Sequence, residues 1–312
     1  MFPVPNIEKV SLVAPLGLCF HDAATGERVS EGLSVSVYPA AQRAQKLWKK
    51  RTYAFANRSG VYVLHKAHGL EEFTRGAGDD EFWRNLETPK PFVVEVIDNE
   101  SRFQPFRFTV NLPVRGIYQW ENTPAVSPNK SLQSIPLYSA PARKILGGMA
   151  AVRADLRESL DKGAAFAILE ARFQGSLVAR GIADRDGQIL LMFPALSPQN
   201  NPLVSPSSDA TRISLAEQQW NLDLSIKYQP SIFQTSPPAE AVTDAEEVLP
   251  DLRLALAQSA GTLWANAEKT ESFTTAVLRF GKDLILRSRA APTSSPPLAE
   301  TVLSSYLFVS PA

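Results

Sequence analysis

The chain has 312 residues, of which 44% are hydrophobic and 21% charged, a composition typical of a soluble globular protein with room for two domains. Lys plus Arg and Asp plus Glu each number 32, so no net charge draws the protein toward nucleic acid or an anionic membrane. Cys19 is the only cysteine, which excludes an intrachain disulfide. No apolar run reaches the roughly 20 residues of a membrane helix, and the N-terminus lacks the basic start and apolar core of a signal peptide. We therefore expect a cytoplasmic protein that does not insert into a membrane.

Short strands and tight turns are expected in the first part of the chain. Residues 33–38 alternate apolar and polar side chains, which is the period of a half-buried strand. Residues 52–64 predict a hairpin whose turn uses Asn57 and Gly60, because glycine adopts a positive φ without steric cost and asparagine hydrogen-bonds its own backbone. Residues 92–112 predict a second hairpin, turned near its middle.

A variant of the first turn returns at residues 184–187, where Asp184 and Gly187 take the places of Asn57 and Gly60. The repetition suggests two copies of one hairpin, and therefore two copies of one β-module. Further strands are expected at 149–156, 165–172, 176–182, 188–193, 220–228 and 306–309, with a hairpin at 275–287 and a helix at 250–260.

These elements predict an all-β fold of two consecutive antiparallel β-sandwich modules, at residues 1–140 and 141–312, with one or two short helices. The 24 prolines concentrate in long connecting loops, as expected between strands. Segments 229–249 and 290–299 are interpreted as Pro-rich arms of the second module. Residues 65–90 form a long excursion, which inside a compact domain is usually functional or a packing lid.

No motif in the sequence assembles a catalytic site. The Gly-x-Ser-x-Gly nucleophile elbow, the P-loop and a complete Gly-x-Gly-x-x-Gly are all absent. His65 and His68 lie three apart, but a metal site needs at least one more fixed ligand. Asp184 opens a segment that begins like a calcium loop, yet the Glu that closes such a loop is missing. We therefore expect no catalytic residue, no cofactor and no metal; a metal-dependent enzyme using His65 and His68 is the most distant alternative.

Two groups of residues are candidates for a protein interface. The basic stretch 43–51 could bind an acidic partner, although it also fits a solvated loop or a strand edge protected by lysines. Aromatic residues in loop segments either pack their own loop down or anchor an interface. The interface candidates are Arg43, Lys46, Trp48, Lys49, Lys50, Arg51, Phe82, Trp83, Trp120 and Trp264. No nucleic acid is expected as a partner.

Two stretches near the N-terminus carry a resemblance to a known family. They are P-L-G-L-C-F-H-D-A-A-T-G at 15–26 and N-R-S-G-V-Y at 57–62. Together they resemble the transthyretin-like, carboxypeptidase-regulatory type of β-sandwich, in which a D-x-x-T-G turn leads into strands and a small-residue/Gly hairpin follows. The resemblance implies that the first module is a transthyretin-like sandwich.

A second resemblance spans most of the chain. Its phrases are P-F-V-V-E-V-I-D at 91–98, R-F-Q-P-F-R-F at 102–108 and R-G-I-A-D-R-D-G-Q-I-L-L-M-F at 180–193. They resemble an accessory protein of contractile injection systems, the phage-tail-like particles of bacteria. The resemblance implies a structural part near the baseplate or cap, with no catalytic residues to carry over.

We therefore expect a non-catalytic component of a multi-subunit particle, which contributes to baseplate or cap assembly through its loops and strand edges. Its expected partners are other protein subunits, with multiple copies in each particle. The alternative is a monomeric binding module for a carbohydrate or a peptide.

Overall fold

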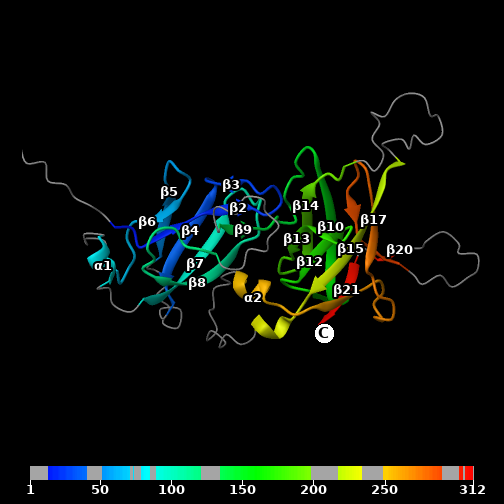
Figure 1. Cartoon of the computed structure of the whole chain (residues 1–312). Coiled ribbons are helices and arrows are strands. Elements are labelled where there is room, and N and C mark those ends of the chain that lie inside the picture. The colour runs from blue at the N-terminus through cyan, green and yellow to red at the C-terminus, as the bar shows by residue number, and fades with distance from the viewer. Residues whose placement is uncertain are drawn as a thin grey trace, which may run out of the picture. The chain divides into compact units, whose positions relative to one another are not determined.

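Strands dominate the structure, a computed structural model that describes residues 13–40, 51–70, 73, 79–84, 89–120, 134–197, 217–233, 249–289, 302–304 and 306–311 (Figure 1). Its helices are the short α1 (Asp80–Arg84) and α2 (Leu252–Leu256), with a 3-10 turn η5 at Pro230–Phe233. The predicted all-β class is confirmed. The chain divides into two compact units: unit 1 contains Met1–His21, Arg28–Asn99 and Phe106–Ile135, and unit 2 contains Asp22–Glu27, Glu100–Pro105 and Pro136–Ala312.

Unit 1 is built around a six-stranded antiparallel sheet. Its strands run in the order β1 (Leu16–Leu18), β6 (Tyr62–Leu64), β5 (Thr52–Ala56), β4 (Leu33–Pro39), β7 (Lys90–Asp98) and β8 (Phe106–Leu112). A small second sheet has the order β3 (Arg28–Val29), β2 (Phe20–Asp22) and β9 (Ile135–Leu137). Alternate residues of the large sheet face a core in which Val94 lies between Val37 and Phe108 in register. This alternation is what the period-two pattern predicts.

Unit 2 contains two larger sheets. One has the order β11 (Lys162–Gly163), β10 (Met149–Ser159), β21 (Tyr306–Pro311) and β16 (Gly261–Trp264), with β14 (Gln188–Pro194) and β18 (Leu284–Ile285) also paired to β10. The other has the order β13 (Ser176–Ile182), β12 (Ile168–Phe173), β15 (Gln219–Lys227) and β17 (Thr275–Arg279). A two-stranded ribbon joins β19 (Ser288–Arg289) and β20 (Val302–Ser304). Strands β18 and β21 run parallel to β10, which departs from the purely antiparallel expectation.

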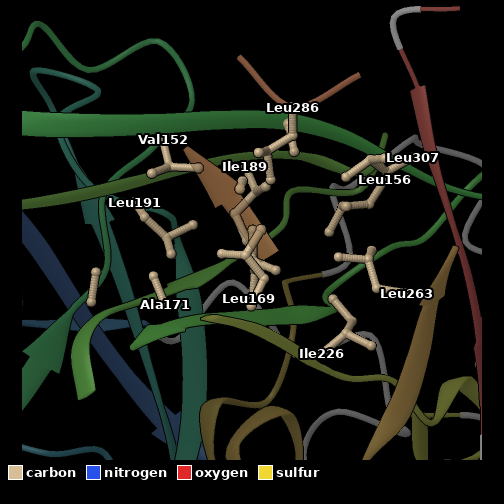
Figure 2. Packing of buried hydrophobic residues seen from close by; sticks show 14 of the residues in the cluster. Val152, Leu156, Leu169, Ala171, Ile189, Leu191, Ile226, Leu263, Leu286 and Leu307 are labelled. Carbon is tan, nitrogen blue, oxygen red and sulfur yellow. The ribbon is translucent and has the colours of Figure 1, made fainter. Parts of the chain in front are cut away.

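The core of unit 2 lies where side chains from these two sheets meet (Figure 2). Leu169 and Ile226 come from the four-stranded sheet, whereas Val152, Leu156 and Leu307 come from the sheet around β10. Strand β15 shows how the sequence specifies this packing: its residues alternate between exposed polar and buried apolar along most of its length. A strand with one apolar face is stable only when that face is covered, here by the second sheet.

The repeated turn forms twice with the same hydrogen bonds. Oδ1 of Asn57 accepts the backbone N–H of Ser59 and of Val61 at 2.9 and 3.0 Å. Oδ1 of Asp184 accepts the corresponding N–H groups of Asp186 and Gln188 at 2.9 and 2.8 Å. The glycine at the fourth position has a positive φ in both turns, +69° at Gly60 and +89° at Gly187.

The expectation that both turns close hairpins is wrong for the second one. The first turn joins β5 and β6, which pair with each other. The second turn leads from β13 in one sheet to β14 in the other, where β14 pairs with β10. The turn at residues 280–283 likewise joins β17 and β18, which belong to different sheets, so the hairpin expected at 275–287 is also wrong. Local turn chemistry fixes the reversal of the chain, whereas pairing with distant strands decides which sheet the next strand enters.

Candidate interaction surface

Of the residues named in the predicted basic stretch, only Arg51 belongs to the part of the chain that the structure describes. Arg43, Lys46, Trp48, Lys49 and Lys50 lie outside the described residues. Arg51 is described, and its guanidinium lies 3.0 Å from Oε2 of Glu95 and above the ring of Tyr38. Its charge is therefore engaged within unit 1.

The aromatic residues of α1 pack against their own segment. Phe82 and Trp83 are half-buried, and both rings contact Phe73, with centroid distances of 5.0 and 5.3 Å. The two rings also meet each other edge to face at 5.8 Å. Phe82 and Trp83 thus pack against an aromatic residue of their own segment, as in the packing alternative for such a loop.

Trp120 was expected at an interface, and the structure corrects this. Its side chain is 1% exposed and meets the ring of Phe108 edge to face at 5.4 Å, so it fills the core of unit 1 and is out of reach of a partner. Trp264 is half-buried in β16, and its indole N–H donates to Oγ of Ser310 at 3.0 Å. That bond joins β16 to β21 within the same sheet.

Large apolar side chains instead gather on the outer face of the six-stranded sheet. In β5, Ala54 faces the core, so Tyr53 and Phe55 point outward and are 48% and 67% exposed. On β7, Ile97 is 41% exposed. Exposed aromatic side chains on a sheet are unusual because half of each strand's residues already lie in the core and the other half normally face water with polar groups.

The strand register brings these side chains into rows across the sheet. Phe55 lies opposite Val63 of β6, and Ile97 of β7 lies opposite Ser34 of β4. Strands β4 and β5 are antiparallel and Val35 pairs with Ala54. The next position along this pair of strands therefore places Ser34 beside Phe55. The row therefore runs Val63, Phe55, Ser34 and Ile97, with apolar side chains on both sides of Ser34. We call this row, together with Tyr53, the aromatic face.

A polar row borders the aromatic face. Tyr53 lies opposite Ser36, which lies opposite Glu95 on the next strand. The Glu95 carboxylate is nearly buried; it accepts a hydrogen bond from the hydroxyl of Tyr38 at 2.7 Å and pairs with Arg51 at 3.0 Å. Glu95 and Arg51 thus neutralise each other beside the aromatic face, and Arg107 of β8 lies opposite Glu95 in the same row.

The size of the aromatic face is in the range of functional patches. With about 200 Å² for each aromatic side chain, the exposed fractions of Tyr53, Phe55 and Ile97 amount to roughly 300 Å². The largest apolar patch on a typical monomer is about 300–600 Å² and is often a binding site. Tyr53, Phe55 and Ile97 were missed in the sequence, although the alternation T-Y-A-F-A carried a signal: if the alanines face the core, the aromatic rings face water.

The histidines and carboxylates singled out in the sequence do not come together as a metal site in the described part of the chain. No group of three or more His, Cys, Asp or Glu side chains in the described part of the chain is placed to hold a metal ion. His65 is exposed and His68 half-buried. Nδ1 of His21 lies 2.7 Å from the hydroxyl of Ser134. The carboxylate of Asp184, the start of the calcium-like segment, is used by its own turn, and burial raises its pKa above the ordinary value.

Unit 2 contains a buried carboxylate with a shifted pKa, Glu170 of β12. Burial by itself would raise its pKa, but the charge and hydrogen bonds of Arg180, followed by the charges of Lys227 and Arg172, hold the pKa below the ordinary value. Nη2 of Arg180 lies 2.7 Å from Oε1 of Glu170, and Arg180 also hydrogen-bonds Tyr138. Because Arg180, Arg172 and Lys227 all pair with this one carboxylate from within unit 2, we interpret the cluster as a structural network.

A second buried ion pair in unit 2 fixes the turn D-x-x-T-G. The guanidinium of Arg143 donates to both carboxylate oxygens of Asp22, at 3.1 and 2.5 Å, and stacks on the ring of Phe103 at 4.7 Å. Arg143 also donates to the hydroxyl of Ser139 at 2.9 Å. This bidentate geometry is the strong form of an Arg–carboxylate contact.

The fold and the aromatic face define a β-sandwich protein with an exposed apolar surface. No protein-family model matches the chain, and no curated protein matches it. None of the helices that the structure describes has the length and apolar character needed to cross a membrane.

Among solved structures, the chain is similar to the TIE protein of Bacillus anthracis, with 8% identity and a TM-score of 0.21 over 69% of this chain and 29% of that one. It is also similar to a candidate adhesin from Bacteroides ovatus, with 9% identity and a TM-score of 0.18 over 84% of this chain and 91% of that one. The chain thus spans less than a third of the Bacillus anthracis protein. Both TM-scores are too low to carry an argument about function. The resemblances to transthyretin-like sandwiches and to contractile injection systems rest on the sequence alone.

Proposed function

We propose that the chain is a non-catalytic structural subunit of a multi-subunit, phage-tail-like contractile particle, and that the aromatic face docks against a neighbouring protein subunit. One observation carries the docking: Phe55 is 67% exposed beside Tyr53 and Ile97 on one face of a regular sheet. The type of particle and a place near its baseplate or cap rest on the sequence resemblance.

The chemistry of the aromatic face fits a protein neighbour. Interface hot spots are enriched in aromatic side chains at the centre, with polar residues excluding water around them. Here Phe55 is central, and the neutralised pair of Glu95 and Arg51 lies on the next rows of the same face. Covering the exposed part of Phe55, about 130 Å², would contribute at most about 3 kcal/mol, or roughly 100-fold in the dissociation constant.

One feature favours a second candidate function, a carbohydrate-binding module. Tyr53 and Phe55 lie two residues apart on the same face of β5, so their rings are neighbours, and aromatic rings also pack against the apolar faces of sugars.

The test compares three versions of the full chain as bait in the native host. These are the wild type, the double variant Tyr53→Ser/Phe55→Ser, and the control Val277→Ser, which removes an exposed apolar side chain (45% exposed) from β17 in unit 2. We expect wild type and control to co-purify with structural subunits of a contractile particle, identified by mass spectrometry, and the double variant to lose them. Equal recovery with all three baits would refute docking through the aromatic face. Binding of the purified wild type, but not of the double variant, to a glycan array would instead support the carbohydrate module.

A further inference from the structure

Three cations surround the buried Glu170 on the outer face of the four-stranded sheet of unit 2. They come from three neighbouring strands: Arg180 from β13, Arg172 from β12 and Lys227 from β15 (Figure 1). Because alternate residues of these strands fill the core, the charged side chains between them face away from it. We call this group of three cations the basic surface.

One of the three cations already neutralises Glu170. Nε and Nη2 of Arg180 lie 2.9 and 2.7 Å from Oε1 of Glu170, and the side chain of Arg180 is only 16% exposed. The other two cations add charge to a carboxylate that is already paired: Nη2 of Arg172 lies 3.2 Å from Oε2, and Nζ of Lys227 lies 3.6 Å from Oε1. Their side chains are 43% and 34% exposed, so a partner can reach both of them. The basic surface therefore combines a satisfied buried pair with two further cations that face solvent.

Protection of a sheet edge does not account for these two cations. Charged side chains often occupy edge strands, where they prevent pairing with another chain. Here β12 lies between β13 and β15, and β15 lies between β12 and β17, so Arg172 and Lys227 belong to internal strands. The chain as a whole is neutral, with 32 basic and 32 acidic residues, so the surplus of positive charge is a local property of this face.

The residues next to the basic surface favour an acidic protein segment over a phosphate backbone. The exposed Asp223 lies opposite Arg172 in register, and the exposed Ser225 lies opposite Glu170. A phosphate backbone carries a negative charge at every step and would meet Asp223 as well as the cations. A polypeptide can place its carboxylates at the two exposed cations and hydrogen-bond donors beside Asp223 and Ser225. Guanidinium and carboxylate groups also match in geometry, which makes their hydrogen bonds strong.

We propose that the basic surface binds an acidic segment of a partner protein, with carboxylates of the segment paired to Arg172 and Lys227. The binding should weaken as salt is added, because charges at a surface are screened over about 8 Å at physiological ionic strength. It uses unit 2 and is independent of docking on the aromatic face. Val277, which lies on β17 opposite Asn221, is outside the basic surface.

The test measures binding of a fluorescent peptide of alternating Glu and Ser residues to the purified full chain by fluorescence anisotropy at low salt. A peptide in which Gln replaces each Glu is the neutral probe. The variants are Arg172→Gln, Lys227→Gln and the two combined, and the matched control is Arg279→Gln, which removes an exposed arginine of β17 from the same face. Each single variant should raise the dissociation constant about two- to fivefold and the double variant about tenfold, because exposed ion pairs are individually weak. The control should leave it unchanged.

Equal binding of the Glu and Gln peptides to the wild type overturns the proposal, as does a double variant that binds the Glu peptide as well as Arg279→Gln does. A single-stranded oligonucleotide is measured in parallel. If it binds more tightly than the Glu peptide and loses affinity in the same variants, the basic surface belongs to a nucleic acid and the acidic protein partner is wrong.

Circular dichroism spectra compare the fold of each variant with that of the wild type. If Arg172→Gln unfolds unit 2, Lys227→Gln alone still decides the test, because Lys227 makes only the longer contact with Glu170. Failure of the subunit pull-down together with intact binding of the Glu peptide would count against the proposed function and leave this inference standing.

Discussion

Replacing Gly187 by alanine tests how the second turn is built into unit 2. Gly187 has a φ of +89°, and a Cβ atom there would lie 2.1 Å from the carbonyl oxygen of Leu156 and 2.9 Å from the amide nitrogen of Ala164. Both neighbours are backbone atoms, and the N–H of Leu156 donates to the carbonyl of Gly187 at 2.8 Å. The added methyl group therefore cannot be accommodated by a side-chain rotation, and relieving it must shift the backbone of β10 or break this hydrogen bond.

Two other glycines provide matched controls for the magnitude. At Gly26 the φ is +74° and nothing lies within 4 Å of the added Cβ, so Gly26→Ala should cost only the conformational penalty, about 1 kcal/mol. At Gly60, in the equivalent turn of unit 1, the added Cβ would lie 2.7 Å from the Cβ of Ser30. Gly60→Ala should therefore lower the free energy of unfolding by about 2 kcal/mol in total. At Gly187 the clash with backbone atoms adds to the conformational penalty, so Gly187→Ala should lower the free energy of unfolding by about 3–5 kcal/mol.

Urea unfolding followed by hydrogen exchange on individual peptides is the suitable assay, because two units need not unfold in one transition. We expect Gly187→Ala to lower the protection of β10 and β14 strongly and to leave β5 and β6 unchanged. Gly60→Ala should show the reverse, with a smaller loss. If Gly187→Ala costs no more than Gly26→Ala, the described packing of the second turn against β10 is wrong.

Three further predictions concern charged residues of unit 2. The lowered pKa of Glu170 means that the ionised carboxylate stabilises the fold above its ordinary pKa of 4.5, and that this stability is lost as the pH falls through the lower folded value. Between pH 4.5 and that lower value, the free energy of unfolding should therefore fall less steeply with decreasing pH in Glu170→Gln than in the wild type. Arg143→Leu leaves the Asp22 carboxylate buried without its partner and should cost about 3–5 kcal/mol in urea unfolding, whereas Asp22→Asn/Arg143→Leu should cost clearly less. Asp251→Ala removes the cap that accepts the backbone N–H groups of Arg253 and Leu254, and should cost about 1 kcal/mol with loss of protection confined to α2.

The fold class could be predicted from the sequence because a strand that is buried on one face alternates apolar and polar residues. Residues 220–228 alternate apolar and polar, and β15 is found at Gln219–Lys227 with this alternation buried and exposed. The turns at 57–60 and 184–187 could also be read locally, since a side-chain oxygen and a glycine suffice to specify them.

The pairing of strands could not be predicted, because partners far apart in the sequence select one another. Strand β10 pairs with β21, about 150 residues later, in parallel orientation, and nothing local to either strand encodes this. Trp120 was placed at an interface for a related reason. Trp120 sits in a segment without periodicity and is buried by Phe108, whereas Phe55 belongs to a regular strand and is exposed. Whether an aromatic residue in a strand is exposed can be predicted only when it is known which face of that strand packs against the core.

The central claim is that the aromatic face is covered by a neighbouring subunit, and cross-linking in the living host tests it most directly. A photoreactive amino acid is placed at position 55, with position 277 of unit 2 as the exposed control, in otherwise wild-type chain. We predict that position 55 forms a cross-link to one defined structural subunit of a contractile particle and that position 277 does not. Cross-links from position 55 that are absent, or that are the same as those from position 277, would contradict the account.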